Sequence, residues 1–289
     1  GTSSLGSNTT GASNTSVGQN SLLSNTTGAS NVAVGALSLD ANTTGADIVA
    51  VGRDALGANT TGASNVAVGK DALVLSTTAA NNVAIGHRAS SSSTTANSNV
   101  IIGQLAGSSL TTGSDNTFIG LLSGAHAVAA TTAAQNVIIG NYSDVTAVGT
   151  ARANVLGYNV SGAQDYTTLG NAGNDIRAAH GNVTWATVSD ERVKKDIEDS
   201  TVGLNFINDL RPVTFNYKNK GDLPTEFRGY EKDSTEVYKS KKSQHGFIAQ
   251  EVKAAIDKHS DIKNGFSMWD DNDETGQQRV GETAVIPVL

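Results

Sequence analysis

The chain has 289 residues, contains no cysteine and carries a formal net charge of −7 at neutral pH. Without cysteine there is no disulfide framework, no thiolate metal site and no cysteine nucleophile. The first 188 residues hold 8 acidic and 5 basic side chains, with no lysine or arginine cluster. They therefore lack the electrostatic footprint of a nucleic-acid-binding protein, and we expect neither DNA nor RNA as a partner.

The composition changes sharply near residue 188. All three prolines and every glutamate lie beyond Val188, whereas the preceding region consists mainly of Gly, Ala, Ser, Thr, Asn and Val. This break predicts a domain boundary. No apolar run approaches the roughly 20 residues needed to span a bilayer, and no signal peptide precedes the first repeat, so we expect no membrane insertion.

Glycines in the first region recur at a fixed interval, which indicates an internal repeat. Asn-Thr-Thr-Gly tetrapeptides keep the same 17-residue step and begin at Asn8, Asn25, Asn42 and Asn59. The glycines of the main series are Gly1, Gly18, Gly35, Gly52, Gly69, Gly86, Gly103 and Gly120. A disordered linker is the alternative that such a polar composition suggests, but a linker has no reason to hold a period.

Each repeat predicts one coil of a β-solenoid. Val32 and Val34 are two residues apart and point to one face of a short strand. Gly35 then permits a corner with positive φ, and the Asn-Thr-Thr-Gly unit supplies a second turn, in which we expect its glycine to be left-handed as well. We interpret the Asn-x-Thr triplets as turns rather than as glycosylation acceptors. The interior residues are small, so stacking of coils or of chains must provide the stability.

The segments Asn-Val-Ala-Val-Gly and Asn-Val-Ile-Ile-Gly resemble the head repeats of trimeric autotransporter adhesins. That resemblance covers about residues 1–140 and implies a left-handed parallel β-roll that associates as a trimer. Gly140 follows Gly120 after 20 residues instead of 17, so the 17-residue spacing of the glycines is lost beyond Gly120. We expect residues 141–188 to form a different shaft or a neck.

Residues 189–289 predict a small α+β domain. Apolar residues at helical spacing alternate here with residues at strand spacing. The first helix is predicted around Leu204, Ile207 and Leu210, a strand around Val213, Phe215 and Tyr217, and a second helix around Ile248, Val252 and Ile256.

Three stretches of this domain carry a pattern: Ser189 to Ile197, Leu210 to Lys218 and His245 to Val252. In order and spacing they resemble the peptidase S74 family, the intramolecular chaperone domains of phage endosialidases, tailspikes and neck appendages. The resemblance implies that the domain trimerises, templates folding of the preceding fibre and then cuts itself off.

By the same resemblance the cleaved bond is Val188–Ser189, Ser189 is the nucleophile and Lys194 is its base. Arg192 and His245 are supporting residues. Without the family pattern, the segment from Ser189 to Lys195 would be interpreted as a solvated charged loop and His245 as a structural residue.

The implied chemistry is reasonable on its own terms. A serine hydroxyl is a weak nucleophile until a base takes its proton, and a neutral lysine serves as that base. Because free lysine titrates near ~10.4, Lys194 must be desolvated or lie near another cation, such as Arg192 or Lys195. Either the hydroxyl of Ser189 attacks the carbonyl before it to form an ester, or water is activated directly. The five-residue spacing fits neither one helical face nor one side of a strand, so a turn or a neighbouring subunit must join the pair.

A second motif lies near the end of the chain. Five residues fall at positions 1, 3, 5, 6 and 12 of an EF-hand loop. They are Asp271, Asp273, Thr275, Gly276 and Glu282. Threonine at position 5 is a weak ligand and Gln278 replaces the usual apolar residue, so we interpret the segment as a polar hairpin turn and expect no metal and no cofactor.

Together these features predict a mainly β protein: a trimeric β-roll or β-helix shaft followed by a small α+β chaperone domain. The best hypothesis is a homotrimeric segment of a phage tail fibre or tailspike in the virion. Its last domain would be a single-turnover serine autoprotease, without an external substrate, that is released in the host cytoplasm. A host receptor or glycan would be bound by upstream parts of the fibre.

The alternative is a bacterial trimeric surface adhesin head without proteolysis, which should end in a membrane β-strand anchor that is not seen here. A glycan-degrading tailspike is a third possibility. It would require inward-facing carboxylate pairs, and the first region contains no glutamate and only scattered aspartates.

Overall fold

The protein is described by a computed structural model in which the chain forms two compact units, Gly1–Asp190 and Glu191–Leu289. The described residues are 1–181, 186–187, 203–227, 229–259, 262, 268–270 and 279–280. Within this part of the chain no helix is long and apolar enough to cross a membrane.

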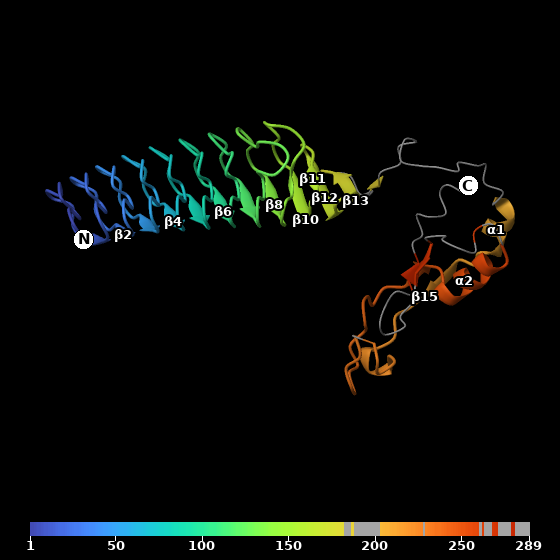
Figure 1. Cartoon of the computed structure of the whole chain (residues 1–289). Coiled ribbons are helices and arrows are strands. Elements are labelled where there is room, and N and C mark those ends of the chain that lie inside the picture. Colours follow the sequence, from blue (N-terminus) through green and yellow to red (C-terminus); the bar gives the residue numbers. More distant parts are fainter. Residues whose placement is uncertain are drawn as a thin grey trace. The chain divides into compact units, whose positions relative to one another are not determined.

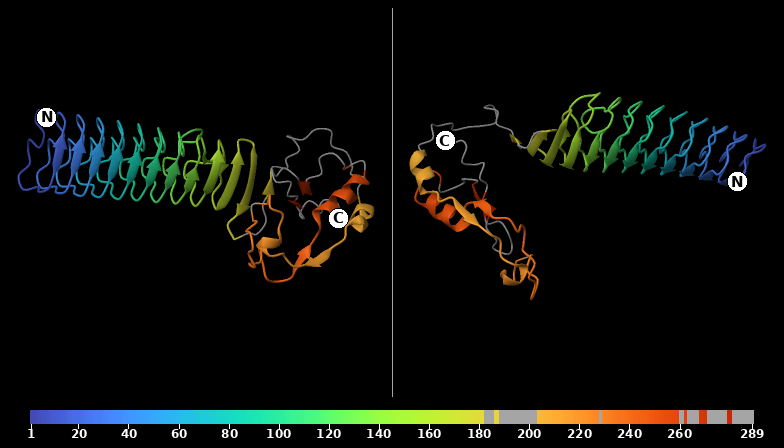
Figure 2. Two further views of the ribbon diagram at one scale, coloured as in Figure 1. Left: turned by 90° about the horizontal axis from the view of Figure 1, so that it is seen from below. Right: turned by 180° about the vertical axis from the view of Figure 1, so that it is seen from behind.

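The first unit is a β-solenoid in which one three-residue strand from each coil stacks on the next (Figure 1). Neighbouring strands are parallel and paired one repeat apart, so that Ala33 lies opposite Ala50 and Ala50 opposite Ala67. The strands are β1 (Thr15–Val17), β2 (Val32–Val34), β3 (Val49–Val51), β4 (Val66–Val68), β5 (Val83–Ile85), β6 (Val100–Ile102), β7 (Thr117–Ile119) and β8 (Val137–Ile139). The two views of Figure 2 show the same succession of coils in chain order. The predicted mainly β solenoid is confirmed.

The central residue of each strand points into the coil, and the two flanking residues point out. In β2, Ala33 is fully buried, while Val32 and Val34 are half-buried on the outer face. Across the coil interior from these alanines lies a second column of buried residues, formed by Leu22, Leu39, Leu56 and Leu73. Small strand residues leave space for leucine, which explains how a narrow coil still buries apolar surface.

In later coils the bulky residue changes sides. Ile101 and Phe118 replace the strand alanines and are buried, while Gly107 and Gly124 stand at the leucine positions. A Cβ atom added to Gly124 would approach the ring of Phe118 to 2.5 Å. The interior volume is therefore conserved between these coils by a paired exchange, as close packing requires.

The two predicted turns differ from each other. Gly35 has φ of +135°, as expected for the corner. The prediction of a left-handed glycine in Asn-Thr-Thr-Gly is wrong, because Gly45 does not have a positive φ. Glycine is required there by close approach: an added Cβ would lie 2.4 Å from both Asn42 Oδ1 and Gly62 O. The left-handed conformation occurs instead before each strand and in the segment after it, for example at Leu37 and Leu39.

Asparagine side chains form a ladder inside the second turn. The Asn42 amide donates to Asn25 Oδ1 at 2.8 Å and to its own coil's Gly45 carbonyl at 3.0 Å. The Asn59 amide repeats this pattern one coil further, donating to Asn42 Oδ1 at 2.9 Å. The buried amide nitrogens are thus satisfied by the coils beside them, which ties each coil to its neighbour. Asn59 Oδ1 lacks a partner, because Ser76 stands at the next position of the ladder.

Beyond Ile139 the parallel stack continues through β10 (Asn154–Tyr158) and β12 (Tyr166–Asn171). A second, two-stranded parallel pair is formed by β9 (Asp144–Val145) and β11 (Ser161–Gly162). The pairing then becomes antiparallel in β13 (Asn174–Ala179) and β14 (Ala186–Thr187).

The second unit combines two helices with short antiparallel strand pairs. Its elements are α1 (Leu204–Asp209), β15 (Val213–Phe215), the 3-10 helix η2 (Lys220–Asp222), β16 (Gln244–Gly246), α2 (Ala249–Asp257), β17 (Trp269–Asp270) and β18 (Arg279–Val280). Its buried cluster consists of Phe206, Val252, Ala255, Ile256 and Met268.

Both helices and the strand lie where the apolar spacing predicts them, with three corrections. Leu204, expected on the apolar face, is 72% exposed, and Phe206 is the buried residue of α1. Ile248, expected on the apolar face of the second helix, is its N-cap residue and is 37% exposed. The six-residue helix is too short for the spacing to fix which face is buried. The strand ends at Phe215 and does not include Tyr217.

Candidate functional site

His245 is the candidate site residue that the structure describes. It lies at the centre of β16, which pairs antiparallel with β15 so that His245 faces Thr214 across the ladder. The imidazole Nδ1 is 3.1 Å from Thr214 Oγ1, within hydrogen-bond distance, and both side chains are exposed. This contact occupies one ring nitrogen and leaves Nε2 available to another group.

The hydrogen bond has a chemical consequence because the two ring nitrogens of a neutral histidine differ. When the threonine hydroxyl donates to Nδ1, Nε2 carries the proton and acts as a donor; when Nδ1–H donates to the hydroxyl, Nε2 is the basic nitrogen. In both cases Thr214 fixes the ring orientation. His245 is therefore presented on a strand with a defined direction, as a supporting residue in catalysis needs.

The strand that carries His245 is anchored by the hydrophobic core. Phe247, two residues later, packs against the buried cluster, and α2 begins at Ala249. An ion pair between the Arg211 guanidinium and the Glu251 carboxylate links the segment before β15 to this helix. The guanidinium holds the pKa of Glu251 below its ordinary value through this hydrogen bond. Both strands of the pair are thus tied to α2.

A second set of charges ties α1 to the end of α2. Asp209 accepts from Lys258 Nζ at 3.1 Å and lies 3.0 Å from His259 Nε2. The pKa of Asp209 is lowered, first by the hydrogen bond from Lys258 and then by that from His259. The ring of His259 also meets Phe206 edge-on at 5.5 Å. These contacts hold α1 against the end of α2. None of them brings a second reactive group next to His245.

The remaining predicted site residues lie outside the described residues. They are the cleavage-site residue Val188, the nucleophile Ser189, the supporting Arg192 and the base Lys194. Their assignments therefore stay predictions, and the geometry of the site is known only on the side of His245.

The EF-hand-like residues Asp271, Asp273, Thr275, Gly276 and Glu282 also lie outside the described part. The strands that flank most of this segment are described: Trp269 pairs with Val280 and Asp270 with Arg279, antiparallel. The interpretation of the segment as a polar turn therefore stays a prediction. Among the described residues no group of three or more His, Cys, Asp or Glu side chains is arranged to hold a metal ion.

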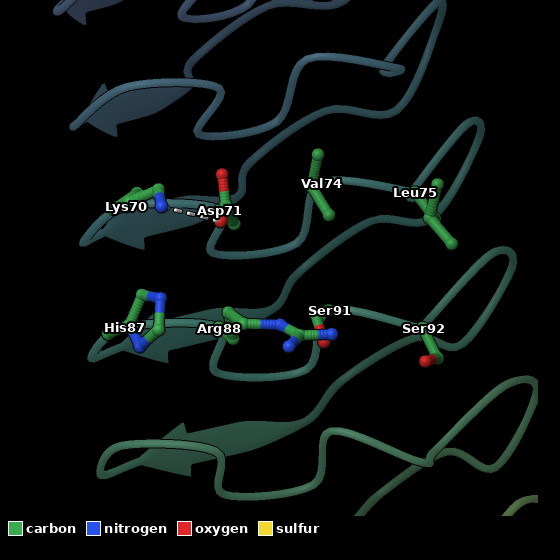
Figure 3. Close-up of a pocket in the computed structure, with 8 residues that line it drawn as sticks. All are labelled: Lys70, Asp71, Val74, Leu75, His87, Arg88, Ser91 and Ser92. Carbon is green, nitrogen blue, oxygen red and sulfur yellow. Dashed lines mark ion pairs between the residues drawn. The ribbon is translucent and has the colours of Figure 1, made fainter.

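The solenoid presents a separate feature, a hollow of about 440 Å³ on its surface between two neighbouring coils. Figure 3 shows Lys70 directed at Asp71 in one coil, and Arg88 extended in the direction of Ser91 in the next. The hollow is lined by Lys70, Asp71, Val74, Leu75, His87, Arg88, Ser91 and Ser92.

Sequence reasoning missed Thr214 and this hollow. Alternation of Val213 and Phe215 identifies a strand and places Thr214 on its other face, but β16 and its register are not visible in the sequence. The hollow has a sequence signal, a run of four serines from Ser90 to Ser93 that interrupts the repeat pattern.

Comparison with protein families gives one match: residues 189–261 match the model of peptidase S74, described as chaperone of endosialidase. The chain thus carries a peptidase S74-type chaperone domain directly after a β-solenoid. Searches of curated proteins and of solved structures found no significant match. The family resemblance inferred from the motifs is confirmed.

Proposed function

We propose that this chain is a segment of a phage tail fibre or tailspike whose last domain trimerises, templates folding of the solenoid and then cleaves the chain at Val188–Ser189. The observation that carries the proposal is the order of its parts. The match to the endosialidase chaperone begins at Ser189, and the solenoid fills the region before it.

Homotrimerisation is supported by the outer face of the solenoid sheet. Each coil adds two β-branched or aliphatic residues to this face, and several are at least 36% exposed. These are Val17, Ile85, Val100, Val137, Ile139 and Leu156. A continuous apolar stripe of this kind is unfavourable in water and is typical of a surface covered by a partner. In the proposed fibre the partners are two further copies of the chain.

The repeat explains why such a shaft needs a template. Three chains with a 17-residue repeat can pair one coil out of register and keep nearly all contacts, because successive coils offer the same strand residues and the same asparagine ladder. A globular trimer at one end selects the alignment in which all three chains start together. Cleavage then removes the chaperone domain, from which unfolding could begin. The fibre is then long-lived because its unfolding is slow.

The proposed cleavage uses the hydroxyl of Ser189 with Lys194 as the base. The deprotonated oxygen attacks the Val188 carbonyl, the bond to the Ser189 nitrogen breaks with protonation of that nitrogen, and water hydrolyses the ester to a free carboxylate and a free amine. Direct attack of an activated water gives the same products. Arg192 serves as a cation that lowers the pKa of Lys194, and His245 offers Nε2 to the reacting groups.

Intact-mass measurement after expression tests the cleavage. The wild-type chain should yield fragments that end at Val188 and begin at Ser189, and Ser189→Ala should stay whole. Lys194→Ala should be nearly inactive, with slow cleavage at high pH because hydroxide partly replaces the base. Cleavage of Ser189→Ala at the same bond would disprove the assignment. Light scattering should give about three times the chain mass for both variants, since their folds are unchanged.

A further inference from the structure

One coil of the solenoid departs from the packing rule of its neighbours. In the coils before it, a strand alanine is matched by a leucine, as in Ala67 and Leu73. In the coils after it, a glycine is matched by a large strand residue. In the coil of β5 both positions are small, Ala84 and Ser90. The residues from Ser90 to Ser93 are all serines, where the preceding coil has Leu-Val-Leu-Ser.

The hydroxyls of this region are buried without partners. Ser76, Ser90, Ser91 and Ser93 are at most 4% exposed, and the Oγ atom of each lacks a hydrogen bond. Elsewhere Ser38 Oγ donates to the Gly35 carbonyl at 3.0 Å, while the buried Ser109 Oγ and Thr168 Oγ1 also lack a partner. Each unsatisfied buried polar group costs about 1–3 kcal/mol. Three of these hydroxyls, those of Ser90, Ser91 and Ser93, lie in one coil, and Ser76 lies in the coil before it.

The hollow described above lies on the surface of the same coil, and its charges are unevenly paired. Lys70 Nζ lies 3.7 Å from Asp71 Oδ2, and the other oxygen of this carboxylate lies 3.9 Å from Arg53 in the coil before. Arg88 makes no ion pair with any described residue, and it is exposed. Next to it are the hydroxyl-bearing Ser91 and Ser92, and Leu75 is 52% exposed. Unpaired guanidinium, hydroxyl and apolar groups thus border one hollow (Figure 3).

We propose that this hollow binds the anionic oxygen group, carboxylate or phosphate, of a small polar ligand. The Arg88 guanidinium pairs with the anion in its fork geometry, Lys70 adds a second positive charge, and the hydroxyl of Ser92 donates to a ligand oxygen. Leu75 contacts the carbon skeleton.

The proposed site is compatible with the proposed trimer and does not depend on it. The stripe residues Val66 and Val68 belong to the strand before the Gly69 corner, whereas the lining residues follow that corner and lie on another side of the coil. Binding therefore adds a recognition function to the shaft itself, separate from any upstream part of the fibre and from the chaperone domain.

Calorimetric titration of the full chain with D-glucuronate and with inorganic phosphate tests the proposal, with D-glucose as the neutral comparison. At least one anion should bind saturably, once per chain, with affinity that falls as salt is added. Arg88→Gln should weaken binding at least tenfold. The matched control is Arg152→Gln, which removes a basic side chain that pairs with Asp165 and does not line the hollow.

A second variant keeps the test independent of charge. Ser91→Val combined with Ser92→Leu places in this coil the residues that the preceding coil has at Val74 and Leu75, so it should fold and lose binding. Tighter binding of glucuronate assigns a sugar acid, and tighter binding of phosphate assigns a phosphate ester. The proposal is overturned by absence of saturable binding of both anions, by equal binding of glucose, or by equal losses in Arg88→Gln and Arg152→Gln.

Discussion

In the solenoid the contacts of one coil recur 17 residues later, whereas the unit from Glu191 to Leu289 is held by contacts that each have a different pair of partners. The amide of Asn42 donates to Asn25 and that of Asn59 to Asn42. In the second unit, by contrast, Arg211 pairs with Glu251 and Asp209 with Lys258. Repeated contacts stabilise the stack but do not distinguish one register from another. Unique contacts define one alignment, which is why the two regions complement each other in a fibre.

The largest expected effect comes from breaking the repeat. Inserting one residue after Val49 turns the following strand residues over, so that Ala50 points out and Val51 points in. We expect a loss of about 3 kcal/mol, from overpacking and lost ladder contacts. Deleting one whole unit, residues 49–65, should lower the melting temperature far less, because the coils on either side then pair directly. Equal losses from both changes would contradict the solenoid account.

A cavity-filling substitution in the aberrant coil should have the opposite sign. Ser90→Leu restores the leucine column at a position with φ of +52°, close to the +51° of Leu73. It removes an unsatisfied hydroxyl and fills the space beside Ala84, so the free energy of unfolding should rise by about 1 kcal/mol. Denaturant unfolding measures this, with Ser92→Leu as the control outside the interior. A destabilised Ser90→Leu chain would mean that the space is already occupied.

Loss of the Thr214 hydroxyl should slow cleavage without unfolding the second unit. Thr214→Val keeps the β-branched shape and removes the hydrogen bond to His245, about 1.4 kcal/mol or a tenfold decrease in rate. Thr214→Ser should restore the rate, because it returns the hydroxyl that holds the ring. An unchanged rate in Thr214→Val would remove Thr214 from the site, while Ser189→Ala separately tests the cleavage itself.

Acid should destabilise the second unit more than the solenoid. The pKa values of Asp209, Glu236 and Glu251 are lowered by hydrogen bonds from lysine or arginine, so their stabilisation is present above the ordinary values and is lost as pH falls through the lowered ones. Burial raises the pKa of Asp144 and Asp40 above the ordinary 3.8, so these two carboxyl groups bind protons more readily in the folded solenoid than in the unfolded chain. These two groups favour folding more strongly as pH falls through the raised values.

Separate melting curves between about pH 6 and pH 3 measure this difference. The transition of the second unit should move to lower temperature at the acid end. That of the solenoid should move less, because Asp40 and Asp144 offset the loss at Asp165, whose pKa is lowered by the hydrogen bond from Arg152. Asp209→Asn should flatten the dependence of the second unit. Parallel acid shifts in both transitions would show that other carboxylates dominate.

The sequence predicts most of the solenoid because its period appears directly in the glycine and asparagine spacing. It does not predict why each glycine is needed: the corner at Gly35 needs positive φ, whereas Gly45 is needed because Asn42 lies too close for a Cβ atom. That distinction depends on the neighbouring coil. The motifs around Ser189 and His245 identify the family but not Thr214, since the partner of His245 is set by strand pairing across 31 residues.

The central claim is that the second unit directs the folding of the solenoid, and refolding yield tests it most directly. Full-length Ser189→Ala chains and chains that end at Val188 would be unfolded in denaturant, diluted at equal concentration and analysed by light scattering and circular dichroism. The account predicts that the full-length chain returns to a β-rich trimer, whereas the shortened chain gives aggregates or mixed registers. Equal recovery of native trimer from both chains would contradict it.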